Sequence, residues 1–198
     1  KLDANFSLSA FSLSGQSKAM EEKMLADSFV LDGIAILGQA TTIYAKPNTG
    51  KTLLVLWMLI ESIKAGNIKG KDVFYINADD DYKGLVFKLK LAEAHDFEML
   101  SPGHNDFDAP ALQGYMGQMI DNDTATGKII ILDTLKKFTD LMNKKTGSDF
   151  MKRVREFVLK GGTLIMLAHT NKNKDADGNA VYCGTSDIVD DCDCVFIL

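Results

Sequence analysis

The eight residues 45–52, AKPNTGKT, combine residue types that can hold a phosphate group. Backbone N–H groups of this loop can point inward and bind phosphate oxygens, assisted by the positive end of a following helix dipole. Gly50 lets the backbone approach closely, the Lys51 ammonium can bridge two phosphates, and the Thr52 hydroxyl can bind Mg²⁺. The usual pattern begins with glycine, and Ala45 supplies another small residue there. We therefore predict a nucleotide-phosphate site formed by Ala45, Pro47, Asn48, Thr49, Gly50, Lys51 and Thr52.

Acidic side chains follow two apolar segments, at points where buried strands would end. The segment KIIILD (128–133) closes on Asp133, which could hold Mg²⁺ through a water molecule. The segment YINADDD (75–81) contains Asp79 and Asp80, and either carboxylate could be the general base that orients water. The alternatives are a strand-end aspartate that caps a turn and a solvated acidic turn that starts the next helix.

His169 closes a third apolar segment, TLIMLAH (163–169). Beside a nucleotide, its imidazole could contact the terminal phosphate and report whether that group is present. A histidine at a strand end can equally be a hydrogen-bonded residue without a catalytic role. We keep it with Lys51, Asp79 and Asp80 as a predicted catalytic residue.

A regular alternation of apolar and amphipathic segments surrounds these residues. Strands that are apolar on both faces and separated by helices are typical of a parallel sheet covered on both sides. We therefore predict an α/β fold, a three-layer, doubly wound and mainly parallel sheet. The expected strands are 41–45, 72–77, 128–133, 163–169 and 194–198. The expected helices are 52–66, 82–95, 111–121 and 149–160.

The length of 198 residues and the hydrophobic content of 46% fit one well-filled domain. In this prediction residues 1–28 form an N-terminal arm with serine-rich stretches and a short helix at Ser17–Ala26. The remaining residues, 29–198, form the domain. Because the last segment is an apolar strand, we expect the natural chain to continue beyond Leu198.

The composition limits the partners and the compartment of the protein. A net charge of −5 excludes a broad basic surface, so any contact with nucleic acid must be a local patch. Three cysteines, an odd number late in the chain, favour a reducing cytoplasm over a disulfide framework. The longest apolar run, residues 53–60, is too short to span a bilayer, so we expect no membrane partner.

Basic residues gather after Asp133 in TLKKFTDLMNKKTG (134–147), around Phe138. Lysines together with an aromatic ring can hold a single-stranded phosphate backbone and stack a base. A solvated basic loop without a ligand is the alternative. The predicted DNA-binding residues are Lys136, Lys137, Lys144 and Lys145.

The phosphate loop, NADD, IIILD and LAHTNK occur in an order typical of one family. Over residues 30–198 the chain resembles RecA-like P-loop ATPases and, within them, the branch of plasmid RepA and DnaB-type replicative helicases. The resemblance implies ATP and Mg²⁺ as cofactors, with the metal held by Thr52 and Asp133. It implies that Asp79 stands where the family has its catalytic glutamate and that His169 is the γ-phosphate sensor. In that family the sensor strand lies between the strand of the phosphate loop and the strand that ends at the metal-binding aspartate.

The same resemblance implies a homo-oligomeric ring, such as a hexamer, with single-stranded DNA in its central channel. In such rings a basic residue of one subunit completes the site of the next. The two arginines of the chain, Arg153 and Arg155, lie on the helix before the sensor strand, which is a poor place for that role. Lys172 and Lys174 are the predicted trans-acting residues, with an arginine beyond Leu198 as the alternative.

These observations predict a cytoplasmic ATPase that acts on DNA, a helicase or helicase-like ATPase of plasmid, phage or chromosomal replication. One alternative is an ATP-dependent recombination mediator similar to the RecA paralogues. Another is an ATP-controlled assembly switch with slow hydrolysis, because Asp79 is one methylene shorter than the glutamate of the family.

Overall fold

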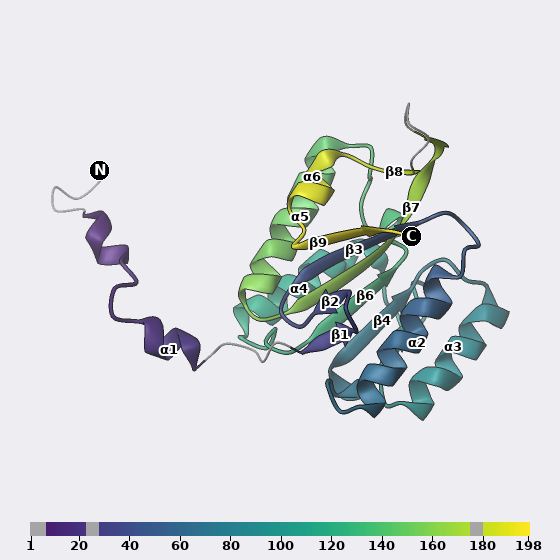
Figure 1. The fold of residues 1–198 in the computed structure, drawn as a ribbon, viewed down its shortest axis with the longest axis horizontal. Helices are drawn as coiled ribbons and strands as arrows, with labels where there is room; N and C mark the ends of the chain where they lie inside the picture. Colours follow the sequence, from purple (N-terminus) through teal and green to yellow (C-terminus); the bar gives the residue numbers. More distant parts are fainter. Residues whose placement is uncertain (1–6, 23–27, 175–179) are drawn as a thin grey trace.

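The structure is a computed structural model that describes residues 7–22, 28–174 and 180–198, with residues 172–174 described by their backbone only. Its centre is a twisted sheet with helices on both faces (Figure 1). This is the three-layer α/β arrangement that the sequence predicts.

The helices divide between the two faces of the sheet (Figure 1). On one face lie α2 (Lys51–Lys64) and α3 (Tyr82–Ala94). On the other lie α4 (Leu112–Asp121), α5 (Lys144–Leu159) and the short α6 (Ser186–Asp190). Each face of the sheet is therefore buried, as the continuously apolar strands require.

The central strands are parallel. One further strand, β8 (Ala180–Tyr182), is antiparallel and pairs with the end of β7 (Thr163–Lys174). The strand β7 lies between β3 and β6, which is the order that the resemblance to RecA-like ATPases implies. From one edge to the other the strands are β5 (Glu98–Leu100), β4 (Val73–Asn77), β6 (Ile129–Asp133), β7 (Thr163–Lys174), β3 (Ala40–Ala45) and β9 (Cys194–Ile197).

The strand register brings the predicted site residues to one edge of the sheet. Asn77 at the end of β4 pairs with Asp133 at the end of β6. Ala45 at the end of β3 pairs with His169 of β7. Because parallel strands have their carboxyl ends on the same side, the loops that follow them converge there.

Two hydrophobic clusters, one on each face of the sheet, form the core. Leu59 of α2 and Ile131 of β6 belong to the cluster beneath α2, and both are fully buried. Phe150 and Phe157 of α5 belong to the cluster on the opposite face. All the residues of β3 and of β6 are buried, so the two strands that carry the phosphate loop and Asp133 are held rigidly.

Several elements differ from the predicted boundaries. Helix α5 begins at Lys144 rather than at residue 149, because the Asn143 side chain caps it by accepting hydrogen bonds from two backbone N–H groups. Strand β7 continues past His169 to Lys174, where a polar segment pairs with β8. Strand β5, the hairpin formed by β1 (Phe29–Leu31) and β2 (Ala35–Ile36), and helix α6 were not expected.

The described part of the N-terminal region carries a short turn, η1 (Leu8–Phe11), and helix α1 (Ser17–Glu21), and every residue there is exposed. The end of the helix expected at Ser17–Ala26 lies outside the described residues. Three further 3₁₀ turns connect the main elements: η2 (Gly70–Asp72), η3 (Ala109–Ala111) and η4 (Leu135–Lys137).

Candidate nucleotide-binding site

The phosphate loop connects β3 to the N-terminus of α2 and lines a cavity of about 560 Å³. Gly50 has φ of +83°, a left-handed conformation that strains any residue with a Cβ atom. Asn48 also has positive φ, and the Thr49 hydroxyl closes the loop by donating to the Lys46 carbonyl at 2.8 Å. Ala45 ends β3 beneath the loop, fully buried, so its small side chain fits. The loop is thus wound around a space that can receive a phosphate.

Lys51 is the first residue of α2 and is almost fully buried. Its ammonium donates a hydrogen bond of 2.6 Å to the Ala168 carbonyl of β7, next to His169. Burial lowers the pKa of Lys51 to about 8, although the nearby Asp133 and Asp79 oppose the shift. A charged amine with so few protein partners is suited to receive an anionic ligand from the cavity.

Asp133 is the acceptor at the centre of a buried polar cluster. Its Oδ2 atom accepts hydrogen bonds from the Thr52 hydroxyl at 2.9 Å, the Tyr75 hydroxyl at 2.8 Å and the Lys88 ammonium at 3.1 Å. Burial raises the pKa of Tyr75 well above its ordinary value, and the Asp133 charge adds to this, so Tyr75 stays a donor. The cluster fixes the orientation of the Thr52 hydroxyl.

The donor set at Thr52 and Asp133 fits a magnesium ion shared with a nucleotide. Hydroxyl and carboxylate oxygens are ligands that Mg²⁺ accepts, and it commonly takes the rest from phosphates and water. Because the Thr52 proton points to Asp133, the lone pairs of its oxygen remain available to a cation. Within the described residues there is no group of three acidic, histidine or cysteine side chains that could hold a metal alone.

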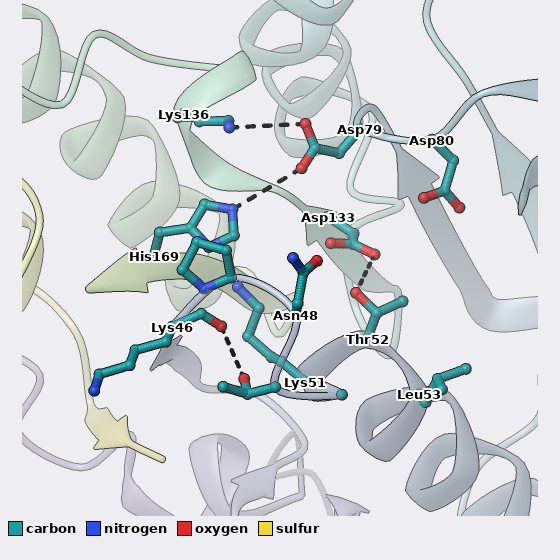
Figure 2. Close-up of a pocket in the computed structure, with 13 residues that line it drawn as sticks. Lys46, Asn48, Lys51, Thr52, Leu53, Asp79, Asp80, Asp133, Lys136 and His169 are labelled. Atoms are coloured by element: carbon teal, nitrogen blue, oxygen red, sulfur yellow. Dashed lines mark hydrogen bonds and ion pairs between the residues drawn. The ribbon is translucent and has the colours of Figure 1, made fainter. Parts of the chain in front are cut away.

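Asp79 and His169 approach each other across the cavity, as Figure 2 shows. His169 Nε2 lies 3.9 Å from Asp79 Oδ2, and Lys136 Nζ lies 3.8 Å from Asp79 Oδ1. Burial lowers the pKa of His169, and the charges of Lys51 and Lys136 lower it further. His169 is therefore neutral near pH 7 and can donate one hydrogen bond to a phosphate oxygen.

Asp80 lines the same cavity but is held on its opposite side, near Asp133 (Figure 2). Its Oδ2 atom lies 2.8 Å from Lys88 Nζ and accepts a hydrogen bond of 3.3 Å from the Asn77 side chain. Lys88 was missed in the sequence. The signal was its spacing, since Lys88 and Ala92 share the buried side of α3, where a lysine needs partners.

The predicted DNA-binding lysines lie on η4 and at the start of α5, and all are exposed. Lys136 and Lys137 line a second cavity of about 570 Å³, whereas Lys144 and Lys145 do not line it. Lys136 lines both this cavity and the phosphate cavity. Phe138 is buried in the core, so the expectation that it stacks on a base is wrong.

The structure describes the side chains of the two arginines but not those of the predicted trans-acting lysines. The side chains of Lys172 and Lys174 lie outside the described residues. Arg153 pairs with Glu156 on its own helix at 2.7 Å, and Arg155 pairs with Asp193 at 2.9 Å. Both arginines therefore have partners within the chain, as their place on α5 suggests.

Comparisons with known proteins agree with this fold. The profile of the family described as AAA domain matches residues 26–175. The fold is similar to the crystal structure of a KaiC-like protein from the hyperthermophilic archaeon Pyrococcus horikoshii, with a TM-score of 0.57 and 11% identity. That match covers 85% of this chain and 74% of the archaeal chain, and at this identity it is a likeness of fold. A search of the curated proteins found no match.

The described residues contain no helix that is long and apolar enough to cross a membrane. The matched residues include the phosphate loop, Asp79, Asp133 and His169. Since the family profile covers more than half of the chain and the sheet has the RecA-like strand order, the chain belongs to the AAA domain family and is a P-loop ATPase domain of RecA-like type.

Proposed function

We propose that the chain binds Mg²⁺ and ATP in the cavity above the phosphate loop and hydrolyses the bond to the γ-phosphate. The observation that carries the proposal is the convergence of Lys51, the Thr52–Asp133 pair, Asp79 and His169 on one cavity of about 560 Å³. Asp133 and His169 lie on adjacent strands, and Asp79 follows β4. Lys51 and Thr52 begin the helix that follows β3, so the order of these four strands brings the residues together.

Each group has a role that its surroundings support. The loop amides and Lys51 bind the phosphates, and Mg²⁺ bound at Thr52 and Asp133 would neutralise charge on the phosphate oxygens. Asp79 accepts a proton from the attacking water while the water oxygen forms a bond to the γ-phosphorus. The bond from that phosphorus to the bridging oxygen breaks, which leaves ADP and phosphate. His169, neutral near pH 7, donates to a γ-phosphate oxygen and loses this contact after hydrolysis.

The test is ATP binding and steady-state hydrolysis by the wild type and Lys51→Ala, with Lys64→Ala as the matched control. Lys64 lies at the other end of the same helix, is exposed and pairs only with Glu61 at the surface in the described structure. We expect Lys51→Ala to lose ATP binding and hydrolysis, and Lys64→Ala to retain both. Wild-type turnover by Lys51→Ala would contradict the proposal.

We further propose that the ATPase works as a homo-oligomeric ring on single-stranded DNA, as a helicase or helicase-like motor. Residues 134–147, which carry the four predicted DNA-binding lysines, are called the lysine loop. The supporting observation is Lys136, which lines both the phosphate cavity and the neighbouring cavity at the lysine loop. Among the described residues, the cation nearest to Asp79 is Lys136, at 3.8 Å. A DNA phosphate that draws Lys136 away would therefore free Asp79. DNA binding and hydrolysis would then share one side chain.

An ATP-controlled assembly switch is the second candidate, favoured by the short Asp79 side chain and by the two arginines being paired within the chain. ATP turnover measured with and without single-stranded DNA separates the two. Strong stimulation by DNA supports the motor. Slow turnover that DNA does not change, together with ATP-dependent assembly in sedimentation, supports the switch.

A further inference from the structure

Lys88 of α3 belongs to the buried cluster around Asp133, and the proposed hydrolysis assigns no role to Lys88 itself. Its side chain is 7% exposed, and its ammonium lies 2.8 Å from Asp80 Oδ2 and 3.1 Å from Asp133 Oδ2. It also donates to the Asn77 side-chain oxygen at 3.2 Å and lies 5.9 Å from the centre of the Tyr75 ring. A buried ammonium is costly unless it is paired and hydrogen-bonded, and here the two carboxylates and the Asn77 side chain supply those partners.

The contacts of Lys88 separate two neighbouring carboxylates. Asp80 is drawn toward Lys88 and Asn77, on the side of Asp133. Asp79 is directed to the other side of the cavity, toward His169 (Figure 2). Without a cation between them, Asp80 and Asp133 would repel each other, since both contact the same nitrogen atom.

Gly84 gives independent evidence that the first turn of α3 accommodates the Asp80 carboxylate in its observed position. A Cβ atom at position 84 would lie 2.9 Å from both Cγ and Oδ2 of Asp80, a distance that requires the carboxylate to move. The Gly84 backbone N–H donates to the Asp81 side chain at 3.0 Å, so Asp81 is occupied as the helix cap. The first turn of α3 therefore leaves space for the Asp80 carboxylate.

We propose that Lys88 is a positioning residue of the nucleotide site: a resident cation that holds Asp80 beside Asp133 and leaves Asp79 to face the attacking water. The inference rests on the proposed ATP hydrolysis for its functional meaning. Its physical content is a charge balance, in which Lys88 offsets the negative charge of Asp80 and Asp133. Lys88 thereby weakens the attraction of this cluster for a divalent cation until a nucleotide brings one.

The first experiment uses Lys88→Met, Asp80→Asn and the double variant, with Lys90→Met as the matched control on the exposed side of α3. The readouts, all without nucleotide, are the midpoint of thermal unfolding and the affinity for Mn²⁺. We expect Lys88→Met to lower the midpoint and to bind Mn²⁺ at least several-fold more tightly. Adding Asp80→Asn should bring the unfolding midpoint and the Mn²⁺ affinity much of the way back to wild-type values, because the net charge of the cluster is again that of the wild type. Additive effects of the two changes would overturn the proposal.

The second experiment concerns Gly84→Ala, which leaves every charge in place. In an ordinary helix position this change stabilises the helix, because alanine has a higher helix propensity than glycine. Here we expect it to lower the unfolding midpoint and to tighten Mn²⁺ binding, because Asp80 is displaced from Lys88. In an Asp80→Ala background the carboxylate is gone and only the Cβ of residue 80, 3.2 Å away, remains close, so the change should destabilise less than in the wild type. Stabilisation in the wild-type background would overturn the proposal, even if Lys88→Met does not fold.

The two proposals fail in different ways. If the wild type binds ATP without hydrolysing it, the unfolding and Mn²⁺ measurements still show whether Lys88 and Asp80 are coupled. If hydrolysis occurs, Lys88→Met should change the Mg²⁺ concentration at half-maximal rate more than the KM for ATP. An unchanged Mg²⁺ dependence with an intact ATPase would refute the positioning role alone.

Discussion

Asp79 and Asp80 are adjacent in the chain, but their surroundings give them different chemistry. Asp79 is partly exposed and faces a neutral histidine and a surface lysine. Asp80 contacts the buried Lys88 and the Asn77 side chain. Both follow the same strand, so the residue pattern alone leaves either as the base, and only the resemblance to RecA-like ATPases points to Asp79. The distinction depends on Lys88, which only the folding of α3 against β4 brings near.

We expect Asp79→Asn to lower the rate of ATP hydrolysis by about 100- to 10,000-fold, the range typical for loss of a general base. ATP affinity should change little, because Asp79 contacts water rather than the phosphates in the proposed mechanism. Single-turnover kinetics and a binding isotherm measure the two quantities. Asp121→Asn, at the exposed end of α4, is the control for an equal change of charge. A rate within a few-fold of the wild type would exclude Asp79 as the base.

Lys51 predicts a pH-dependent uptake of protons on ATP binding. Its pKa in the free protein is about 8, lowered by burial from an ordinary value of 10.5. Phosphate charge raises that pKa again, so the fraction of Lys51 that is neutral above pH 8 gains a proton when ATP binds. We therefore expect ATP affinity to fall between pH 7 and pH 9.

Calorimetry at pH 8.5 in buffers of different ionisation enthalpy measures this uptake, and at pH 6.5 it should be close to zero for Lys51. Equal proton uptake at both pH values would contradict the assignment. The effect on stability has a definite sign. Because the folded-state pKa lies below the unfolded one, Lys51 costs stability at low pH, and this cost is relieved as pH rises above about 8.

At the scale of the elements, the sequence is informative where burial repeats regularly. Strands β3, β4, β6 and β7 are apolar on both faces, so their existence and their parallel order could be predicted. The polar continuation of β7 to Lys174 could not be predicted, because this segment pairs with β8 and does not show the apolar pattern of a strand buried in the core. The same limit applies to Lys88, since a lysine pattern on a helix does not show which carboxylates it reaches.

The turn η4 and the start of α5 place the lysine loop beside the phosphate cavity. We expect Lys136→Ala with Lys137→Ala to weaken binding of single-stranded DNA and to reduce the dependence of affinity on salt, because two phosphate contacts are lost. Fluorescence anisotropy of a labelled oligonucleotide at several salt concentrations measures both. Lys71→Ala, exposed on η2 before β4 begins, is the control. Equal salt dependence in all variants would place the DNA elsewhere.

At the scale of the whole molecule, α2 and α3 cover the same face of the sheet (Figure 1). Both helices carry large apolar side chains that are exposed to solvent. Trp57 is 61% exposed and Phe87 is 55% exposed, and Leu53, Tyr82 and Val86 add to the same pair of helices. Exposed apolar side chains that form a contiguous patch are commonly covered by a partner. A second copy of the chain is the occupant that the proposed homo-oligomer provides.

The single tryptophan of the chain makes this testable. As protein concentration rises with Mg²⁺ and ATP present, we expect the Trp57 emission to shift to shorter wavelength, because assembly removes the ring from water. Sedimentation velocity on the same samples gives the size of the assembly. Assembly without any change in the emission would show that another surface forms the contact. Phe87→Ser should weaken assembly if α3 shares the interface.

Lys136 belongs to both cavities, and this has a thermodynamic consequence for the proposed motor. A side chain that two ligands compete for couples their binding free energies, and the coupling is the same in both directions. If DNA alters the affinities for ATP and for ADP through Lys136 by different factors, then exchanging ATP for ADP must alter the affinity for DNA by the ratio of those factors. One ammonium group could thus set how firmly each subunit holds the strand at each stage of its ATP cycle.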